Sequence, residues 1–151
     1  MKFEQYAQEA NLFVKEVASE LNNEQDRDHA YRVLTAVLHT IREIITPEES
    51  LHLVSQLPMY LKAVYVNEWT LRVRERIRSL NEFLECLRSK SGQTAARDFG
   101  NNHNAVEKTK AVLSVLRRHV STGELQDIID QFPVELAGLW ITDAREKEQV
   151  S

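Results

Sequence analysis

Apolar residues recur at helical spacing along most of the chain. Over residues 3–21 they follow one another at steps of three and four, and the same spacing returns over residues 30–45. That period places apolar side chains on one face of a helix. A third helix is predicted from Thr46, which suits an N-cap, with Pro47 at the first helical position. Pro58 interrupts the hydrogen-bond ladder of that helix, so a break and a short new helix are predicted there.

Residues 70–90 contain two competing patterns. Residues 71–74 alternate apolar and basic side chains as a strand does, whereas a longer stripe at steps of four and three favours one helix. The stripe consists of Val73, Ile77, Leu80, Leu84 and Leu87. Residues 89–103 lack such a period, and one long loop is predicted there. Helices are predicted again from about Asn104 and after Ser121, and the charged residues 143–151 are predicted to fray.

The second half of the chain aligns with the first at a shift of 75 residues. Residues 30–65 then match residues 105–140 without a gap, including two N-capping sequences and two Gln-x-Pro breaks. The matched pairs are Thr46 with Ser121, Glu49 with Glu124, Gln56 with Gln131 and Pro58 with Pro133. Helices with similar apolar faces often look alike by chance, but matched caps and breaks at one offset are much harder to obtain that way. We therefore predict an internal duplication, with repeat one over residues 1–69 and repeat two over residues 70–142.

The predicted fold class is all-α, a compact bundle of about eight helices built from two tandem, pseudo-symmetric repeats. The two repeats are expected to share one core as a single domain. Composition suits this, because a chain of 151 residues with 42% hydrophobic residues can bury roughly 70% of its unfolded surface. Such a chain needs neither a disulfide nor a metal to hold its core.

Cysteine content, the length of apolar runs and net charge limit the compartments and partners expected for the protein. Cys86 is the only cysteine, which excludes an internal disulfide and a four-thiolate zinc site and favours a reducing cytoplasm. No apolar run is long enough for a transmembrane helix, so no membrane insertion is expected. The net charge of −4 argues against a general nucleic-acid binder, which gains its affinity from neutralised phosphates.

Several strings carry a family resemblance over nearly the whole chain. They are AVLHTIRE from Ala36, TPEE from Thr46, QLP from Gln56, the stretch from Tyr65 to Trp69, and VLRRHVSTGELQDIIDQFPVEL from Val115, with LW ending at Trp140. These strings resemble an uncharacterised bacterial family, domain of unknown function 2267. The resemblance implies an all-helical, cytoplasmic bacterial protein and supplies no activity, substrate or cofactor. The family often has Gly before the first Trp, where this chain has Glu68; the departure matters if that turn requires a positive φ.

Four residues that match the family pattern form a candidate patch: His39, Arg42, Trp69 and His119. His39 and Arg42 lie one helical turn apart, and His119 ends its helix, where partial negative charge favours imidazolium. None of the five histidines forms a common zinc motif on one helix, so structural hydrogen bonds are the favoured interpretation. A ligand or proton-transfer role stays open.

The acids and the cysteine have plain structural interpretations. A capping box accounts for Glu49 and Glu124, because each would bind a backbone N–H at the start of its helix, and the neighbouring Glu48 then needs no catalytic role. Cys86 lies beside the apolar stripe and is interpreted as a small core residue rather than a nucleophile.

A group of arginines and a group of aromatic residues each allow two interpretations. Four arginines are expected on one solvated helix that pairs with nearby acids or binds an anionic partner: Arg72, Arg74, Arg76 and Arg78. Four aromatic residues are expected to seal a core or subunit interface, or to line a pocket: Tyr60, Tyr65, Trp69 and Trp140.

No catalytic residue, metal ligand or cofactor site is predicted from these motifs. The leading hypothesis is a non-catalytic cytoplasmic binding or protein-interaction module, whose partner is another protein or a second copy. The first alternative is a small-ligand receptor or enzyme with its site at the seam between the two repeats. The second is an anionic partner bound by the helix predicted over residues 72–78.

Overall fold

The structure is a computed structural model that describes residues 2–71 and 74–141. The described residues form α-helices with two 3-10 turns and no strand, which confirms the predicted all-α class. In chain order the helices are α1 (Phe3–Glu20), α2 (Arg27–Ile44), α3 (Pro47–Ser55), α4 (Met59–Val66), α5 (Leu80–Ser91), α6 (Ala95–Phe99), α7 (Asn102–His119), α8 (Thr122–Asp130) and α9 (Val134–Ala137). The 3-10 turns are η1 (Gly92–Thr94) and η2 (Gly138–Trp140). The fraying predicted for residues 143–151 lies outside the described residues.

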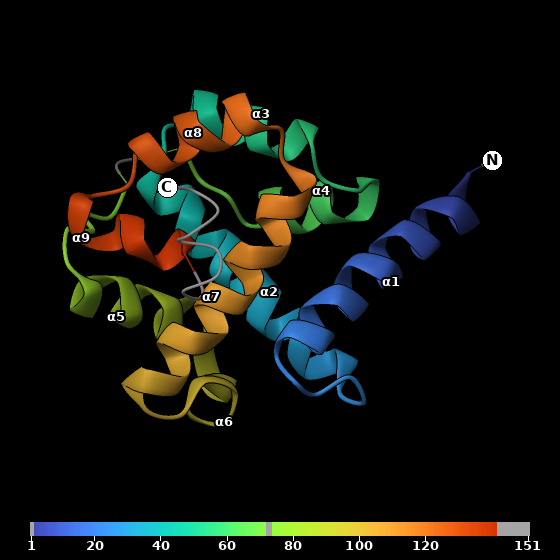
Figure 1. The fold of residues 1–151 in the computed structure, drawn as a ribbon, viewed down its shortest axis with the longest axis horizontal. Helices are drawn as coiled ribbons and strands as arrows, with labels where there is room; N and C mark the ends of the chain where they lie inside the picture. Colours follow the sequence, from blue (N-terminus) through green and yellow to red (C-terminus); the bar gives the residue numbers. More distant parts are fainter. Residues whose placement is uncertain (1, 72–73, 142–151) are drawn as a thin grey trace.

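The two long helices α2 and α7 lie at the centre of the molecule (Figure 1). α1 packs against both of them, and α5 packs against α2. α3 and α8 lie side by side at one end, and α6 lies at the opposite end (Figure 1). This arrangement brings the helix that follows α2 against the helix that follows α7, although the two are far apart in sequence.

One cluster of buried hydrophobic side chains runs through α1–α4 and α5–α9, called here the first and second halves. Its central members lie on the apolar stripes of α2 and α7: Val33, Leu34, Val37, Leu38, Ile41, Val112, Leu113 and Leu116. All of these side chains are fully buried. The apolar spacing in the sequence therefore identified the faces that meet in the core.

The helix bounds keep the offset found in the sequence. Both bounds of α7 lie 75 residues after those of α2, and both bounds of α8 lie 75 residues after those of α3. The outer helices match less well, because α1 has 18 residues and α5 has 12. That the two halves are copies of one repeat stays a prediction.

The single helix predicted over residues 70–90 is wrong. The helix begins only at Leu80, and residues 74–79 are not helical. Ser79 has extended backbone angles and caps α5, since its hydroxyl accepts from the Glu82 N–H at 3.1 Å. The segment before it is tied to the end of α2: the Glu75 N–H donates to the Glu43 carboxylate at 3.1 Å. These contacts hold residues 74–79 out of a helix although the apolar stripe favours one. The first member of the stripe, Val73, lies outside the described residues.

The long loop predicted over residues 89–103 is also wrong. α5 continues to Ser91 and is followed by η1, by α6 and, after two residues, by α7. Gly92 and Gly100 have φ values of 66° and 59°, a region that glycine enters without strain, and they end α5 and α6. Asn101 caps α7 by accepting from the Asn104 N–H at 2.8 Å. The Gly and Asn residues that suggested a loop therefore mark helix ends.

Candidate functional site

Three of the four predicted patch residues gather at the C-terminal end of α4. His39 Nε2 donates to the Val64 carbonyl at 2.7 Å, and one Arg42 nitrogen donates to the Tyr65 and Asn67 carbonyls, both at 2.7 Å. Trp69 makes an edge contact with the Tyr65 ring at 5.8 Å between ring centres. His39 and Arg42 thus bind carbonyl groups that the helix end leaves without a helical partner.

Burial sets the electrostatics of these two side chains. It lowers the pKa of His39, whose bond to the Val64 carbonyl offsets part of that effect, and it also lowers the pKa of Arg42. Glu68, where the family often has Gly, has a φ of 59°. The turn does require the left-handed conformation, which a Glu side chain adopts at a cost. The patch is a structural clamp on α4.

His119 lies elsewhere, against α1. Its Nε2 atom is 3.1 Å from a Glu16 carboxylate oxygen, and its ring contacts the Phe13 ring in a tilted arrangement, with 4.7 Å between ring centres. The neighbouring Arg118 pairs with Glu16 and Glu20 on the same helix. The four predicted residues therefore do not form one site.

The four aromatic residues and Cys86 differ in burial. Tyr65 and Trp140 are buried, and Tyr60 is exposed beside Tyr6. Cys86 is buried as predicted, and burial, aided by Glu75, raises the pKa of its thiol to about 12.

The basic cluster does not lie on a helix. Arg74, Arg76 and Arg78 precede α5 in a non-helical segment, and Arg72 lies outside the described residues. Arg74 donates to the Ile44 carbonyl at 3.1 Å, which holds it against the end of α2. The helix predicted for these arginines is therefore wrong, and the binding of an anionic partner by them stays a prediction.

The contact between α3 and α8, called here the seam, joins the two halves through two glutamines. The Thr46 N–H donates to the Gln131 side-chain carbonyl at 2.7 Å. The Ser121 N–H donates to the Gln56 side-chain carbonyl, also at 2.7 Å. Each half thus supplies the acceptor for the first residue of the helix start in the other half.

This exchange corrects the capping-box interpretation. Thr46 caps α3 as predicted, since its hydroxyl accepts from the Glu49 N–H at 3.1 Å. Ser121 makes no such bond at the start of α8, and its hydroxyl faces the Gln56 amide at 3.4 Å. The N–H groups that Glu49 and Glu124 were expected to bind are taken by the glutamines. The two carboxylates are therefore free of the capping role assigned to them.

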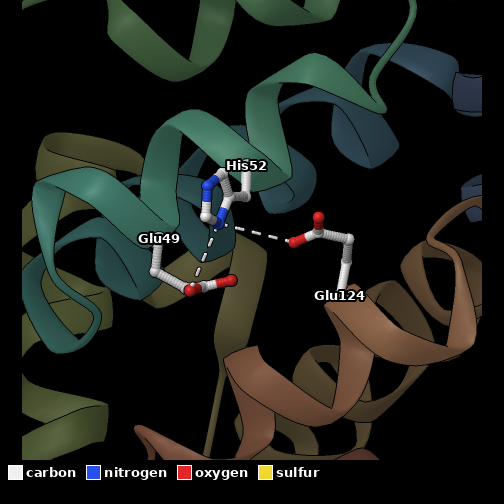
Figure 2. Close-up of side chains that lie close together, drawn as sticks. All are labelled: Glu49, His52 and Glu124. Atoms are coloured by element: carbon white, nitrogen blue, oxygen red, sulfur yellow. Dashed lines mark ion pairs between the residues drawn. The ribbon is translucent and has the colours of Figure 1, made fainter.

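The freed carboxylates converge at the seam (Figure 2). Glu49 is only 7% exposed, and its Oε1 atom is buried without a hydrogen-bond partner. Glu124 also buries one oxygen, Oε2, without a partner. Burial of carboxylate oxygens that receive no hydrogen bond is costly, so this arrangement calls for an explanation.

His52 stands between the two acids (Figure 2). Its Nδ1 atom lies 3.4 Å from Glu49 Oε2 and 3.5 Å from Glu124 Oε2. The His52 side chain is 46% exposed and that of Glu124 is 31% exposed, so the cluster opens to solvent on one side. Glu49, His52 and Glu124 are called the seam cluster below. Their geometry permits a cation to be bound by two oxygens and one imidazole nitrogen.

A second cluster of charged side chains, centred on one buried acid, lies between α2 and α6. Asp98 is fully buried, and Arg32 donates to both of its carboxylate oxygens at 3.0 Å while His29 Nδ1 lies 3.0 Å from one of them. Burial alone raises the pKa of Asp98, but hydrogen bonds from Arg32, Thr94 and His29 hold it well below its ordinary value. Asp98, Arg32 and His29 are called the Asp98 cluster below.

The sequence held a partial signal for the seam cluster. Glu49 and His52 are three residues apart on a predicted helix, which places them on one face. Glu124 comes from the other half, so only the packing of α3 on α8 brings it to them. Sequence reasoning therefore identified both acids but gave them the wrong role, and it did not select His52.

A family model described as an uncharacterised conserved protein, DUF2267, matches residues 10–139. The chain belongs to the DUF2267 family. The match covers every member of the seam cluster and confirms the resemblance inferred from the motifs. No curated protein matches the chain. No helix in the described part of this DUF2267 chain has the length and apolar character needed to cross a membrane.

Proposed function

We propose that this protein is a non-catalytic binding module whose site is the seam cluster and whose ligand is a cation. The observation that carries the proposal is the pair of buried carboxylate oxygens, one from each half, that have no hydrogen-bond partner. A buried charge normally has a partner, and a bound cation supplies one.

The surroundings of the cluster favour a cation over an anion. Within the described residues, no Lys or Arg lies at ion-pair distance from Glu49 or Glu124, and His52 is their one ion-pair partner. His52 is half exposed, so it leaves room for a ligand to approach from solvent. Each acid stands in the first turn of its helix, where the partial positive charge of the helix start favours a negatively charged side chain.

The non-catalytic part of the proposal rests on how the other candidate residues are used. His39 and Arg42 bind the end of α4, and His119 binds Glu16. These contacts give a structural account of the groups that sequence reasoning left open for chemistry. A cytoplasmic location is part of the proposal as well, because the free thiol of Cys86 suits a reducing compartment.

The test is a titration of isotope-labelled protein with cations of several classes, followed by amide chemical shifts. The probes are Zn²⁺, Ca²⁺, methylammonium and guanidinium at constant ionic strength. At least one of them should produce saturable shifts in α3 and α8, and Glu124→Gln should weaken its binding about tenfold or more. Glu48→Gln is the matched control, since Glu48 is the exposed neighbour of Glu49 and should bind as the wild type does. Absence of saturable shifts with every probe, or unchanged binding by Glu124→Gln, would contradict the proposal.

A further inference from the structure

We infer that the cation is a divalent transition metal ion of the zinc class, bound by Glu49, His52 and Glu124 across the seam. This inference rests on the proposed cation site and adds the chemical class of its ligand. It assigns His52 Nδ1 and the carboxylate groups of Glu49 and Glu124 as the metal ligands. The site then contains residues from both halves of the molecule.

The spacing of the three side chains suits such an ion. Zinc bonds to nitrogen and oxygen are about 2.0–2.1 Å long, so neighbouring ligand atoms of a tetrahedral site lie about 3.3–3.4 Å apart. The distances from His52 Nδ1 to the two carboxylate oxygens are 3.4 Å and 3.5 Å. All three ligand atoms lie within 4.8 Å of one another, and the partly exposed Glu124 side chain can turn to close the remaining gap.

The kind of ligand atoms selects the class of metal. Ca²⁺ and Mg²⁺ prefer sites made of oxygen alone, whereas imidazole together with carboxylate suits zinc and its neighbours in the first transition row. His52 is thus the residue that sets the preference. Three protein ligands leave at least one position for water or for a further ligand.

The position of Glu49 adds an observation that does not depend on the acidic character of the cluster. Its side chain is more than nine-tenths buried, yet its Oε1 atom lacks any hydrogen-bond partner. A carboxylate that merely faced solvent would hydrate both oxygens. A metal bound through both oxygens of Glu49 gives Oε1 a partner and accounts for its burial without a protein donor.

The predicted repeat indicates where this specificity arose. Under the 75-residue alignment Glu49 matches Glu124, but His52 matches Asp127, so the imidazole is present in one half only. Replacement of His52 by Asp makes the cluster all-carboxylate. It should lower the affinity for zinc-class ions while retaining or raising the affinity for Ca²⁺.

The experiment uses tag-free protein, stripped with chelator and titrated with Co²⁺, whose visible absorption reports a tetrahedral site with nitrogen and oxygen ligands. One equivalent should bind, Zn²⁺ should displace it, and His52→Gln, Glu49→Gln and Glu124→Gln should each weaken binding at least about tenfold. Glu48→Gln and His103→Asn change an exposed acid and an exposed histidine outside the cluster and should bind as the wild type does. Zn²⁺ should also raise the melting temperature of the wild type, and chelator should reverse the rise.

The outcomes separate the two proposals. Unchanged Co²⁺ binding by His52→Gln, or loss of binding in the His103→Asn control, would overturn the metal assignment. If methylammonium or guanidinium binds in a Glu124-dependent manner while Co²⁺ and Zn²⁺ do not, the metal inference fails and the cation site stands. If no cation binds, both fail. Amide spectra of each variant verify folding, and the chelator reversal in the wild type gives a result that needs no variant.

Discussion

Two acids of this protein, Asp98 and Glu49, are both buried but differ in their partners. Asp98 is fully buried and receives hydrogen bonds from Arg32 and His29 on a neighbouring helix. Glu49 is 7% exposed, and no described Arg or Lys pairs with it. The fold supplies the counter-charge in the first cluster and leaves it to be supplied in the second. A buried acid with complete partners indicates structure, and one with an unpaired oxygen indicates a place for a ligand.

The seam cluster tolerates this deficit because of where its acids stand. Glu49 and Glu124 lie in the first turns of α3 and α8, and each helix start carries a partial positive charge. The glutamines Gln131 and Gln56 take over the N-cap N–H groups, so neither carboxylate is drawn away to them. Helix dipoles thus offset part of the repulsion without filling the position between the acids.

The largest expected effect is the loss of the Asp98 carboxylate. Asp98→Ala leaves Arg32 and His29 without their partner and should lower the free energy of unfolding by about 2–4 kcal/mol. Glu49→Gln, at a similarly buried acid, should change it by less than about 1 kcal/mol because no cationic group depends on Glu49 alone. Denaturant unfolding at pH 7 measures both. Asp28→Ala controls for an exposed acid nearby, and equal losses in the first two variants would remove the distinction between the clusters.

Lowering the pH should also show the contribution of the paired Asp98 carboxylate to stability. The pKa of Asp98 is lowered in the folded protein, so its stabilisation is present above the ordinary carboxyl range near pH 4 and is lost as the pH falls through the lower folded value. Between about pH 5 and pH 2 the wild type should therefore lose more stability than Asp98→Asn does. Parallel pH profiles for the two proteins would show that Asp98 makes no such contribution.

Removal of the two N-cap hydroxyl groups at the seam should lower stability by smaller and unequal amounts. Thr46→Ala removes a hydroxyl that accepts from the Glu49 N–H and should cost about 1 kcal/mol. Ser121→Ala removes a hydroxyl without a capping bond and should cost only a few tenths of a kcal/mol, or roughly the lower end of the capping range. Thermal unfolding of the two variants side by side is the measurement. A larger loss in Ser121→Ala would mean that α8 is capped by its own serine and that Glu124 is the expected capping-box acid.

The long helices and the starts of α3 and α8 were predictable from the sequence. The apolar period marks which face of α2 and α7 enters the core, and the matched N-caps and prolines mark where α3 and α8 begin. Residues 74–79 were not predictable in this way, because contacts with the end of α2 hold them out of a helix despite a suitable period. The Gly and Asn residues of the stretch 89–103 gave correct break points but did not reveal the helix α6 between them.

Only part of the candidate site could be predicted from the sequence. The sequence pattern selected Glu49 and Glu124, and the local capping rule assigned each carboxylate to its own helix. What overturned that assignment was a pair of glutamines from opposite halves, a tertiary contact that local sequence rules do not contain. His39 and Arg42 were selected for their chemistry, but their partners are backbone carbonyls of α4.

A comparably small effect is expected from the interaction between Glu49 and Glu124 themselves. Their ligand oxygens lie within 4.8 Å of each other, so two ionised carboxylates should repel in metal-free protein. Glu124→Gln should therefore stabilise the wild type more than it stabilises the Glu49→Gln protein, by about 0.5 kcal/mol. The helix-dipole contribution of each acid cancels in this comparison, which isolates the pair.

The measurement is a double-mutant cycle by denaturant unfolding with chelator at pH 8, above the ordinary titration range of imidazole. The difference should shrink at high salt, since the cluster is open to solvent on one side. A coupling of zero would show that one carboxyl group is protonated or turned away, and a cation would then gain only one charged ligand at the seam. If Zn²⁺ converts a repulsive coupling into an attractive one, the metal bridges α3 and α8. The repulsion between the two acids in the metal-free protein is then relieved by metal binding.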